Sequence, residues 1–185
     1  MTSILPLDEL NRVDAQLSER FAGKPLKQED DQDDIIDMLL DLFLMAYSIG
    51  VNVTNENLSS NWKPSLDEVM KVVDEKIAGK TWRERVSDYF KNGGTGGDIA
   101  RIADTESHRI ANTGALDAAR HAGASTKTWV TMMDDRVRET HDYLEGMSVP
   151  IDEDFYTYDG DHAPAPGLFE LAENNVNCRC ELLFS

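Results

Sequence analysis

Cysteine is scarce in this chain: its 185 residues include two, Cys178 and Cys180, separated by one residue. Two cysteines so close together cannot form the disulfide framework of a small secreted domain, and their scarcity agrees with a reducing compartment. A signal peptide is not expected either, because the N-terminal sequence MTSILPLDELNRVD becomes acidic within eight residues. These observations predict a protein that is cytoplasmic at synthesis.

Long apolar segments and an excess of basic residues are missing as well. No apolar run approaches the roughly 20 residues of a membrane-spanning helix, so we expect no contact with a membrane. Lys and Arg number 18 against 35 Asp and Glu, which gives a formal net charge of -17. A protein that holds a nucleic acid by itself normally carries a basic patch, because counterion release supplies most of the affinity. DNA contact is therefore expected to be indirect or local.

The first part of the chain has the apolar spacing of helices. A helix from Leu7 to Phe21 is predicted by apolar residues at three- and four-residue steps. Next, the acidic run QEDDQDD precedes an apolar block that ends at Gly50, and acidic residues at a helix start complement the helix dipole. This block is apolar on nearly all sides, which predicts a buried helix or a landing surface for a partner. The polar segment VNVTNENLSSNWKP is predicted to be a loop.

Two capping boxes predict a helical hairpin. Ser65 with Glu68 and Thr81 with Glu84 each have the spacing in which two backbone amides at a helix start are paired reciprocally. The glycine-rich sequence NGGTGG follows, and we interpret residues 93–97 as a hinge. A phosphate-binding loop is not favoured, because the lysine of the P-loop pattern and a preceding strand are both missing.

A longer helix is predicted from Asp98 to His121, where Gly114 either permits close packing or introduces a kink. Glu106 and Arg109 lie three residues apart on one face of this helix and can pair. If turned inward, the pair could anchor the C-terminal part of the chain.

After Gly123 the pattern changes to short alternating segments. KTWVTM, MSVPI, FYTY and CRCELLF are predicted strands, and a short helix is predicted to start near Asp135. The sequence therefore predicts an α+β fold. Its helical N-terminal part, residues 1–92, has about four to five helices, and a small C-terminal module with short antiparallel strands occupies residues 98–185.

Cys178 and Cys180 are the candidates for chemistry. Two residues apart in an extended segment, they point to the same face, and with His141 they would supply three zinc ligands. His162 is the other imidazole available in this region. The alternatives are a nucleophilic cysteine paired with His141 and oriented by Asp135 or Asp142, and two small buried cysteines that only pack. The acidic loop IDEDFYTYDGDH does not follow the EF-hand order, and we interpret it as a solvated loop whose aromatic residues pack down.

A polar cluster lies just before these cysteines in the predicted fold. A helix from Asp135 would place Arg138 and His141 on one face, suited either to holding a C-terminal carboxylate or to fixing the turn that carries NCRC. Asp135, Arg136 and His141 are predicted to brace the NCRC strand as a structural ion network.

Several motifs follow one another in a fixed order through the second half of the chain: Thr105, Glu106, Arg109, Trp129, Asp135, Arg136, Arg138, His141, Gly146, Asn177, Cys178, Arg179 and Cys180. As an ordered set, they resemble the phage head morphogenesis family, the Mu F-like minor head proteins. The similarity extends from about Ile99 to Leu183. Many members have a C-x-x-C where this chain has RETH, and a histidine before the final cysteine motif where this chain has NNV. The cysteine-richer family pattern implies zinc, and this chain retains fewer ligands.

The resemblance implies a function without catalysis. Members are minor components of tailed-phage heads that act at or near the portal during procapsid assembly, genome packaging or DNA delivery. It implies that residues 98–185 form the head morphogenesis domain and that residues 1–92 are a docking region for the portal or another head protein. Localisation would be the host cytoplasm during assembly and then the phage head. The alternative is a Cys/His-dependent hydrolase or a toxin-like effector module.

Overall fold

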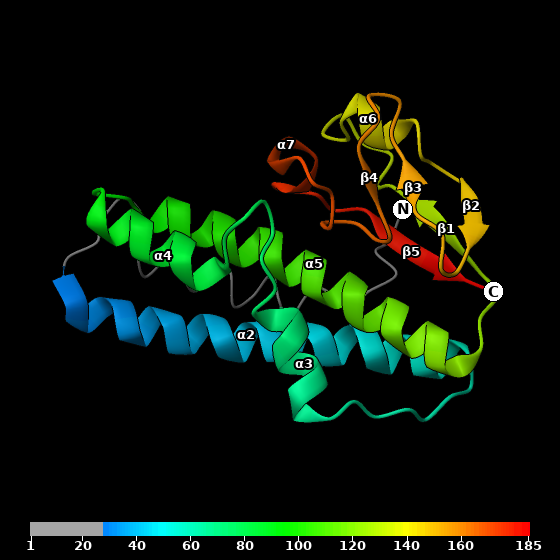
Figure 1. Ribbon diagram of the computed structural model, residues 1–185, viewed down its shortest axis with the longest axis horizontal. Coiled ribbons are helices and arrows are strands. Elements are labelled where there is room, and N and C mark those ends of the chain that lie inside the picture. Colours follow the sequence, from blue (N-terminus) through cyan, green and yellow to red (C-terminus); the bar gives the residue numbers. More distant parts are fainter. Residues whose placement is uncertain (1–27) are drawn as a thin grey trace.

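The computed structural model describes residues 28–185, and Figure 1 shows a long helical layer with a small module of short strands at one end. The predicted α+β fold is confirmed. The predicted helix from Leu7 to Phe21 lies outside the described residues. The helical part consists of α2 (Gln28–Asn57), α3 (Leu66–Val73), α4 (Trp82–Lys91) and α5 (Gly96–Ala122).

The C-terminal module alternates strands with single helical turns. Its elements, in order, are β1 (Thr126–Val130), α6 (Glu139–Asp142), β2 (Ser148–Pro150), β3 (Phe155–Tyr156), β4 (His162–Ala163), α7 (Ala172–Asn175) and β5 (Glu181–Phe184).

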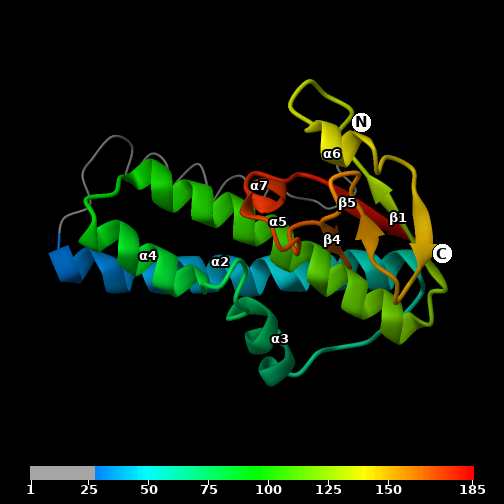
Figure 2. The same cartoon turned by 45° about the horizontal axis from the view of Figure 1, so that its top comes forward.

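Helices α2 and α5 lie side by side in both views (Figures 1 and 2) and supply most of the larger core. Two glycines set their close approach. A Cβ on Gly114 would lie 2.6 Å from the Tyr47 carbonyl oxygen, and one on Gly50 would lie 2.0 Å from the Ala111 carbonyl oxygen. Gly114 therefore serves close packing, and α5 remains one continuous helix through it.

The predicted end of α2 is wrong. The helix does not stop at Gly50 but continues to Asn57, so the predicted loop from Val51 starts seven residues too early. Val51 and Thr54 are buried in this last part, and the side chains on that face continue the contact with α5. The polar composition of the segment reflects the exposed face of a helix that tertiary packing stabilises.

Both predicted capping boxes are confirmed at the starts of α3 and α4. A third pairing, in which the Thr95 backbone N–H donates to Asp98 at 2.8 Å, marks the start of α5. Gly96 and Gly97 are thus the first residues of α5, and the remaining residues of the 93–97 segment form the turn after α4. The larger core includes residues from both sides of this segment, among them Leu39 and Ile99. Bending at this segment stays a prediction.

The module has a three-stranded antiparallel sheet in the order β2-β1-β5 and a separate β3-β4 pair. Thr128 of β1 lies opposite Ser148 of β2 and Leu183 of β5. Two predicted boundaries need correction: the last strand begins at Glu181, after both cysteines, and the short helix begins at Glu139, not near Asp135. A second core lies inside the module, with Trp129 among its fully buried members. Within residues 28–185, no helix combines the length and apolarity needed to cross a membrane.

Candidate metal centre

His141 lies in the single turn of α6, and its ring is held by aromatic packing. The residue is 1% exposed. Its ring centre lies 5.4 Å from that of Trp129, edge to face, and 5.4 Å from that of Phe169, nearly parallel. Among residues 28–185 its Nε2 atom has no hydrogen-bond partner. The aromatic neighbours therefore hold the faces of the imidazole, while its Nδ1 atom faces the two cysteines.

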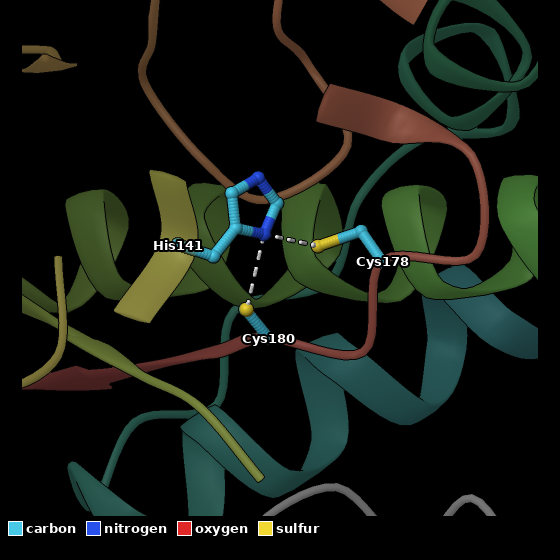
Figure 3. Close-up of side chains that lie close together, drawn as sticks. All are labelled: His141, Cys178 and Cys180. Atoms are coloured by element: carbon cyan, nitrogen blue, oxygen red, sulfur yellow. Dashed lines mark hydrogen bonds between the residues drawn. The ribbon is translucent and has the colours of Figure 1, made fainter. Parts of the chain in front are cut away.

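Cys178 and Cys180 lie in the extended segment between α7 and β5, and both side chains point at the same atom of His141 (Figure 3). The two Sγ atoms lie 3.5 Å and 3.4 Å from His141 Nδ1, in the order Cys178 and Cys180. Each cysteine is 4% exposed. The two-residue spacing predicted this common face, although the segment is not hydrogen-bonded into the sheet.

The three donor atoms all lie within 4.8 Å of one another. With zinc bonds of about 2.3 Å to sulfur and about 2.0–2.1 Å to nitrogen, tetrahedral geometry separates sulfur from nitrogen by about 3.5 Å. The observed distances match this value, and thiolate with imidazole is a donor set that zinc prefers. The residues therefore fit a zinc ion with three protein ligands. Within the described part of the chain, the cluster contains no fourth cysteine, histidine or carboxylate.

The two thiols differ in acidity. A hydrogen bond from Cys180 lowers the pKa of Cys178 well below its ordinary value, while the same contact, with burial, raises the pKa of Cys180. Cys178 is therefore the first of the two to become a thiolate, the form that binds metal.

Two arginines hold the cysteine segment in place: Arg179 lies between the two cysteines, and Arg138 contacts the backbone just before them. Arg179 makes two hydrogen bonds to the Asp134 carboxylate, at 2.8 and 2.7 Å. Arg138 donates to the backbone oxygens of Asn174 and Val176. A hollow of about 10 Å³ remains beside the cluster, lined in part by these arginines. Such a volume holds about one water molecule, so the hollow is too small for an organic substrate.

The predicted brace of the NCRC segment is therefore correct for His141, which contacts both cysteines, and wrong for Asp135 and Arg136. Arg138 fixes the turn before the cysteines, as expected. Asp134 pairs with Arg179, whereas Asp135 and Arg136 are exposed. The segment before α6 is a turn and not a helix, so Asp134 reaches the cysteine segment and Asp135 points to solvent. Adjacent aspartates cannot be told apart by spacing alone.

Several other predicted positions have structural roles near the cluster. Thr105 Oγ1 accepts a hydrogen bond from the Asn177 backbone N–H at 3.1 Å, which ties α5 to the cysteine segment. Asn177 has a φ of 56°, a left-handed conformation that asparagine tolerates. Gly146, with a φ of 71°, turns the chain so that its N–H donates to the Trp129 carbonyl oxygen at 2.9 Å.

The Glu106–Arg109 pair is formed and turned inward, with a 2.7 Å contact between two nearly inaccessible side chains. Its further partners lie mainly in the helical hairpin: Arg85 contacts Glu106 at 2.7 Å, and Arg109 donates to the Val72 carbonyl oxygen at 3.0 Å. Arg109 also lies beneath Gly167 of the module, where a Cβ would lie 2.8 Å from the arginine. The pair thus contacts the module, as expected for an inward orientation, and it also joins the hairpin, which sequence spacing within one helix cannot reveal.

In the acidic loop, the buried carboxylate of Asp161 is hydrogen-bonded by donors of the protein itself. Asp161 accepts hydrogen bonds from the backbone N–H groups of Glu170 and Leu171 and from the Asn174 side chain. These contacts favour the structural interpretation of the loop over a calcium site. Phe155 packs down as expected, while Tyr156 and Tyr158 are exposed.

Sequence comparisons add an independent line of evidence. The 34% identical match to the minor head protein GP7 of Bacillus phage SPP1 extends over 85 residues, which is 44% of this chain and 28% of that protein. An NAD(+)--arginine ADP-ribosyltransferase, EFV, of Enterococcus faecalis is 37% identical over 84 residues, or 43% of this chain and 17% of that protein. The chain therefore spans less than a third of either relative in these matches. No solved structure matches.

A family model described as "Phage Mu protein F like protein" matches residues 62–183. The matched range begins before α3 and includes α4, α5 and nearly all of the C-terminal module. Because it covers more than half of the chain, this protein belongs to the Phage Mu protein F-like family.

Proposed function

We propose that the protein is a minor structural component of a tailed-phage head and has no catalytic turnover. The observation that carries this proposal is the family match over residues 62–183, supported by the similarity to a phage minor head protein. Its place would be at or near the portal, in procapsid assembly, genome packaging or DNA delivery. It would assemble in the host cytoplasm and then reside in the head. With a net charge of -17, contact with DNA would be indirect or local.

The geometry of the cysteine cluster supports a structural role. A nucleophilic cysteine must be reached by its substrate, but Cys178, Cys180 and His141 are all buried around a hollow of about 10 Å³. In this proposal the three residues hold a zinc ion that staples α6 to the segment before β5. The ion would cross-link two segments of a small module with a limited core and would raise its free energy of unfolding, as structural zinc does in other small folds.

The alternative is a Cys/His-dependent hydrolase or a toxin-like effector module. The relative named as an ADP-ribosyltransferase favours it, although the match spans 17% of that protein and its name describes the whole chain. Cys178→Ser and Cys180→Ser separate the two hypotheses. The structural role predicts impaired folding or assembly, whereas the alternative predicts well-folded variants that have lost an activity.

Localisation in a particle tests the head role. We expect cryo-electron microscopy or cross-linking of purified heads to place the full-length chain at the portal vertex. Absence from procapsids and mature heads alike would refute the proposal.

Docking through residues 1–92 calls for a cross-linking design that preserves the fold. Deleting these residues would remove α2 and expose the apolar face of α5, so the intact chain is preferable. Exposed lysines lie in the hairpin, for example Lys80 and Lys91, while Lys127 of the module is buried. An amine-reactive reagent therefore reports mainly on the N-terminal part, and a carboxylate-reactive reagent also reports on the module. Docking by residues 1–92 predicts portal cross-links to the hairpin lysines; portal cross-links confined to module carboxylates would contradict it.

A further inference from the structure

Three tyrosines are exposed on the outer side of the module. Along residues 155–158, Phe155 and Thr157 are buried, whereas Tyr156 and Tyr158 are 60% and 58% exposed. Tyr143, which caps the C-terminal end of α6, is 54% exposed and packs edge to face against Tyr158, with 5.9 Å between the ring centres. Figure 1 shows α6 on the side of the module that faces away from the α2–α5 layer. We call Tyr143, Tyr156 and Tyr158 the tyrosine face.

The segment that carries the tyrosine face is acidic and has no basic residue. Residues 139–178 contain ten Asp and Glu and no Lys or Arg, although the whole chain has 18 basic residues. These 40 residues therefore have a formal charge of -10, against -17 for the whole chain. A surface that concentrates one sign of charge attracts partners of the opposite sign and repels those of the same sign. The tyrosine face is therefore suited to a cationic partner.

Two of these acidic residues lie on the same helical turn as Tyr143. Glu139 precedes Asp142 by three residues and Tyr143 by four, a spacing that places side chains on one side of a helix. The Tyr143 backbone N–H donates to the Glu139 carbonyl oxygen at 3.1 Å, so the turn includes the tyrosine. Neither carboxylate has an ion-pair or hydrogen-bond partner among residues 28–185. A cation that approaches the ring of Tyr143 therefore meets unpaired negative charge.

We propose that the tyrosine face binds an arginine-containing segment of a basic partner protein. A guanidinium group of the partner packs on the ring of Tyr143 or Tyr158, and its N–H groups donate to the carboxylates of α6. Arginine suits both contacts, because its planar cation stacks on aromatic rings and pairs with a carboxylate through two N–H groups. The binding site does not depend on the proposed head function, since it rests on the exposed rings, their packing and the charge around them.

The exposure and the charge of the tyrosine face favour a polypeptide as its occupant. Each ring is more than half exposed, so a single small cation would stay largely hydrated and gain little from one contact. A basic segment can place successive side chains on Tyr143, Tyr158 and Tyr156, and linked contacts strengthen one another. Nucleic acid is disfavoured, because ten acidic residues would repel its phosphates.

Nuclear magnetic resonance on the full-length, isotope-labelled chain tests the proposal with a defined probe. The probe is an Arg-Gly-Arg-Gly-Arg peptide with both ends capped, and the control has citrulline in place of each arginine, which keeps the shape but removes the charge. We expect the probe to cause saturable shifts at the ring signals of Tyr143 and Tyr158. The citrulline control should bind at least about tenfold more weakly, and raising the salt to about 0.5 M should weaken the binding of the probe.

Two pairs of matched variants separate the contribution of the rings from that of the carboxylates. Tyr143→Leu combined with Tyr158→Leu removes both rings at exposed positions and should weaken binding about tenfold, as followed at the amide signals of residues 139–145. Tyr143→Phe combined with Tyr158→Phe keeps both rings and should preserve binding. Glu139→Gln combined with Asp142→Asn should also weaken binding, whereas Glu56→Gln, at an exposed carboxylate of α2, should leave it unchanged.

Four results would overturn the proposal. They are equal binding of the citrulline control, full binding by the leucine variant, shifts confined to residues outside the module, and the absence of saturable shifts at millimolar probe. A fifth comparison uses tetramethylammonium. If this ion saturates the same signals at the concentration that the peptide requires, the face is a site for a small cation, and the proposed polypeptide partner is wrong.

Discussion

Arg179 holds the carboxylate of Asp134 in a bidentate ion pair, with nitrogen–oxygen distances of 2.7 and 2.8 Å, and this pair joins the turn before α6 to the cysteine segment. The hydrogen bonds from Arg179 depress the pKa of Asp134 below its ordinary value of 3.8. A carboxyl group whose pKa is depressed on folding stabilises the folded state above its ordinary pKa, and this contribution disappears as the pH falls toward the folded pKa.

We therefore expect Asp134→Asn to be less stable than the unmodified chain at pH 7, with a difference that shrinks as the pH falls below about 4. Urea unfolding across this range measures the difference. The neighbouring exposed residue gives a matched control, and Asp135→Asn should change little. An equal loss in both variants would show that the Arg179 contact is not responsible.

Metal analysis tests the cysteine and histidine cluster. The full-length chain, purified after expression with zinc, should contain about one zinc ion per chain, and a chelator should lower its Tm. His141→Asn should lose the metal, because it removes one of three ligands. His108→Asn, which changes another buried histidine, should retain it. Substoichiometric metal that a chelator removes without any change in Tm would end the zinc hypothesis.

The buried side chain of Lys127 should make the stability of the fold depend on pH in the alkaline range. Its side chain is buried in β1, and Nζ donates to the Pro164 carbonyl oxygen at 2.8 Å. Burial lowers its pKa from 10.5 to about 8. Between these values the unfolded chain binds more protons than the folded chain, so the free energy of unfolding rises with pH across this window.

Lys127→Met removes this titration. We expect the unmodified chain to gain up to about 3 kcal/mol relative to the variant between pH 7.5 and pH 10.5. Denaturant unfolding at several pH values provides the measurement, and a constant difference across the range would contradict the prediction.

Two helical glycines of α5 should respond in opposite ways to alanine. In Gly114→Ala the new Cβ would lie 2.6 Å from the Tyr47 carbonyl oxygen, and we expect a loss of about 1–3 kcal/mol from overpacking. Gly97 is exposed, and the nearest atom to its new Cβ would be Thr95 Oγ1 at 3.6 Å. Gly97→Ala should therefore gain up to about 1 kcal/mol from helix propensity. Thermal unfolding distinguishes the two, and a stabilised Gly114→Ala would refute the close contact of α2 with α5.

The buried Glu106–Arg109 pair should matter more than an exposed pair of the same spacing. Arg109→Met leaves Glu106 buried with fewer partners, and we expect a loss of about 3–5 kcal/mol. Arg101 forms the matched exposed pair with Asp98, and Arg101→Met should cost about 1 kcal/mol or less. Similar losses in the two variants, measured by urea unfolding, would contradict the special role of the buried pair.

Local signals in the sequence determined the starts of α3 and α4 and the common direction of the two cysteines. The capping boxes of Ser65 and Thr81 depend on contacts over three residues, and the C-x-C direction depends on backbone alternation, so both are independent of distant packing. The ordered motifs were also sufficient to identify the family, which the match over residues 62–183 confirms.

Tertiary structure decided what lies opposite each of these local features. It extended α2 beyond Gly50, because α5 covers the face that includes Val51. It selected Asp134 over Asp135, because a turn directs one of two adjacent carboxylates toward Arg179. It also brought His141 to 3.4 Å from a cysteine 39 residues away. Sequence periodicity shows which side of a helix or strand is apolar, but it does not show which distant element covers that side. The pairing of elements is decided when the two cores pack.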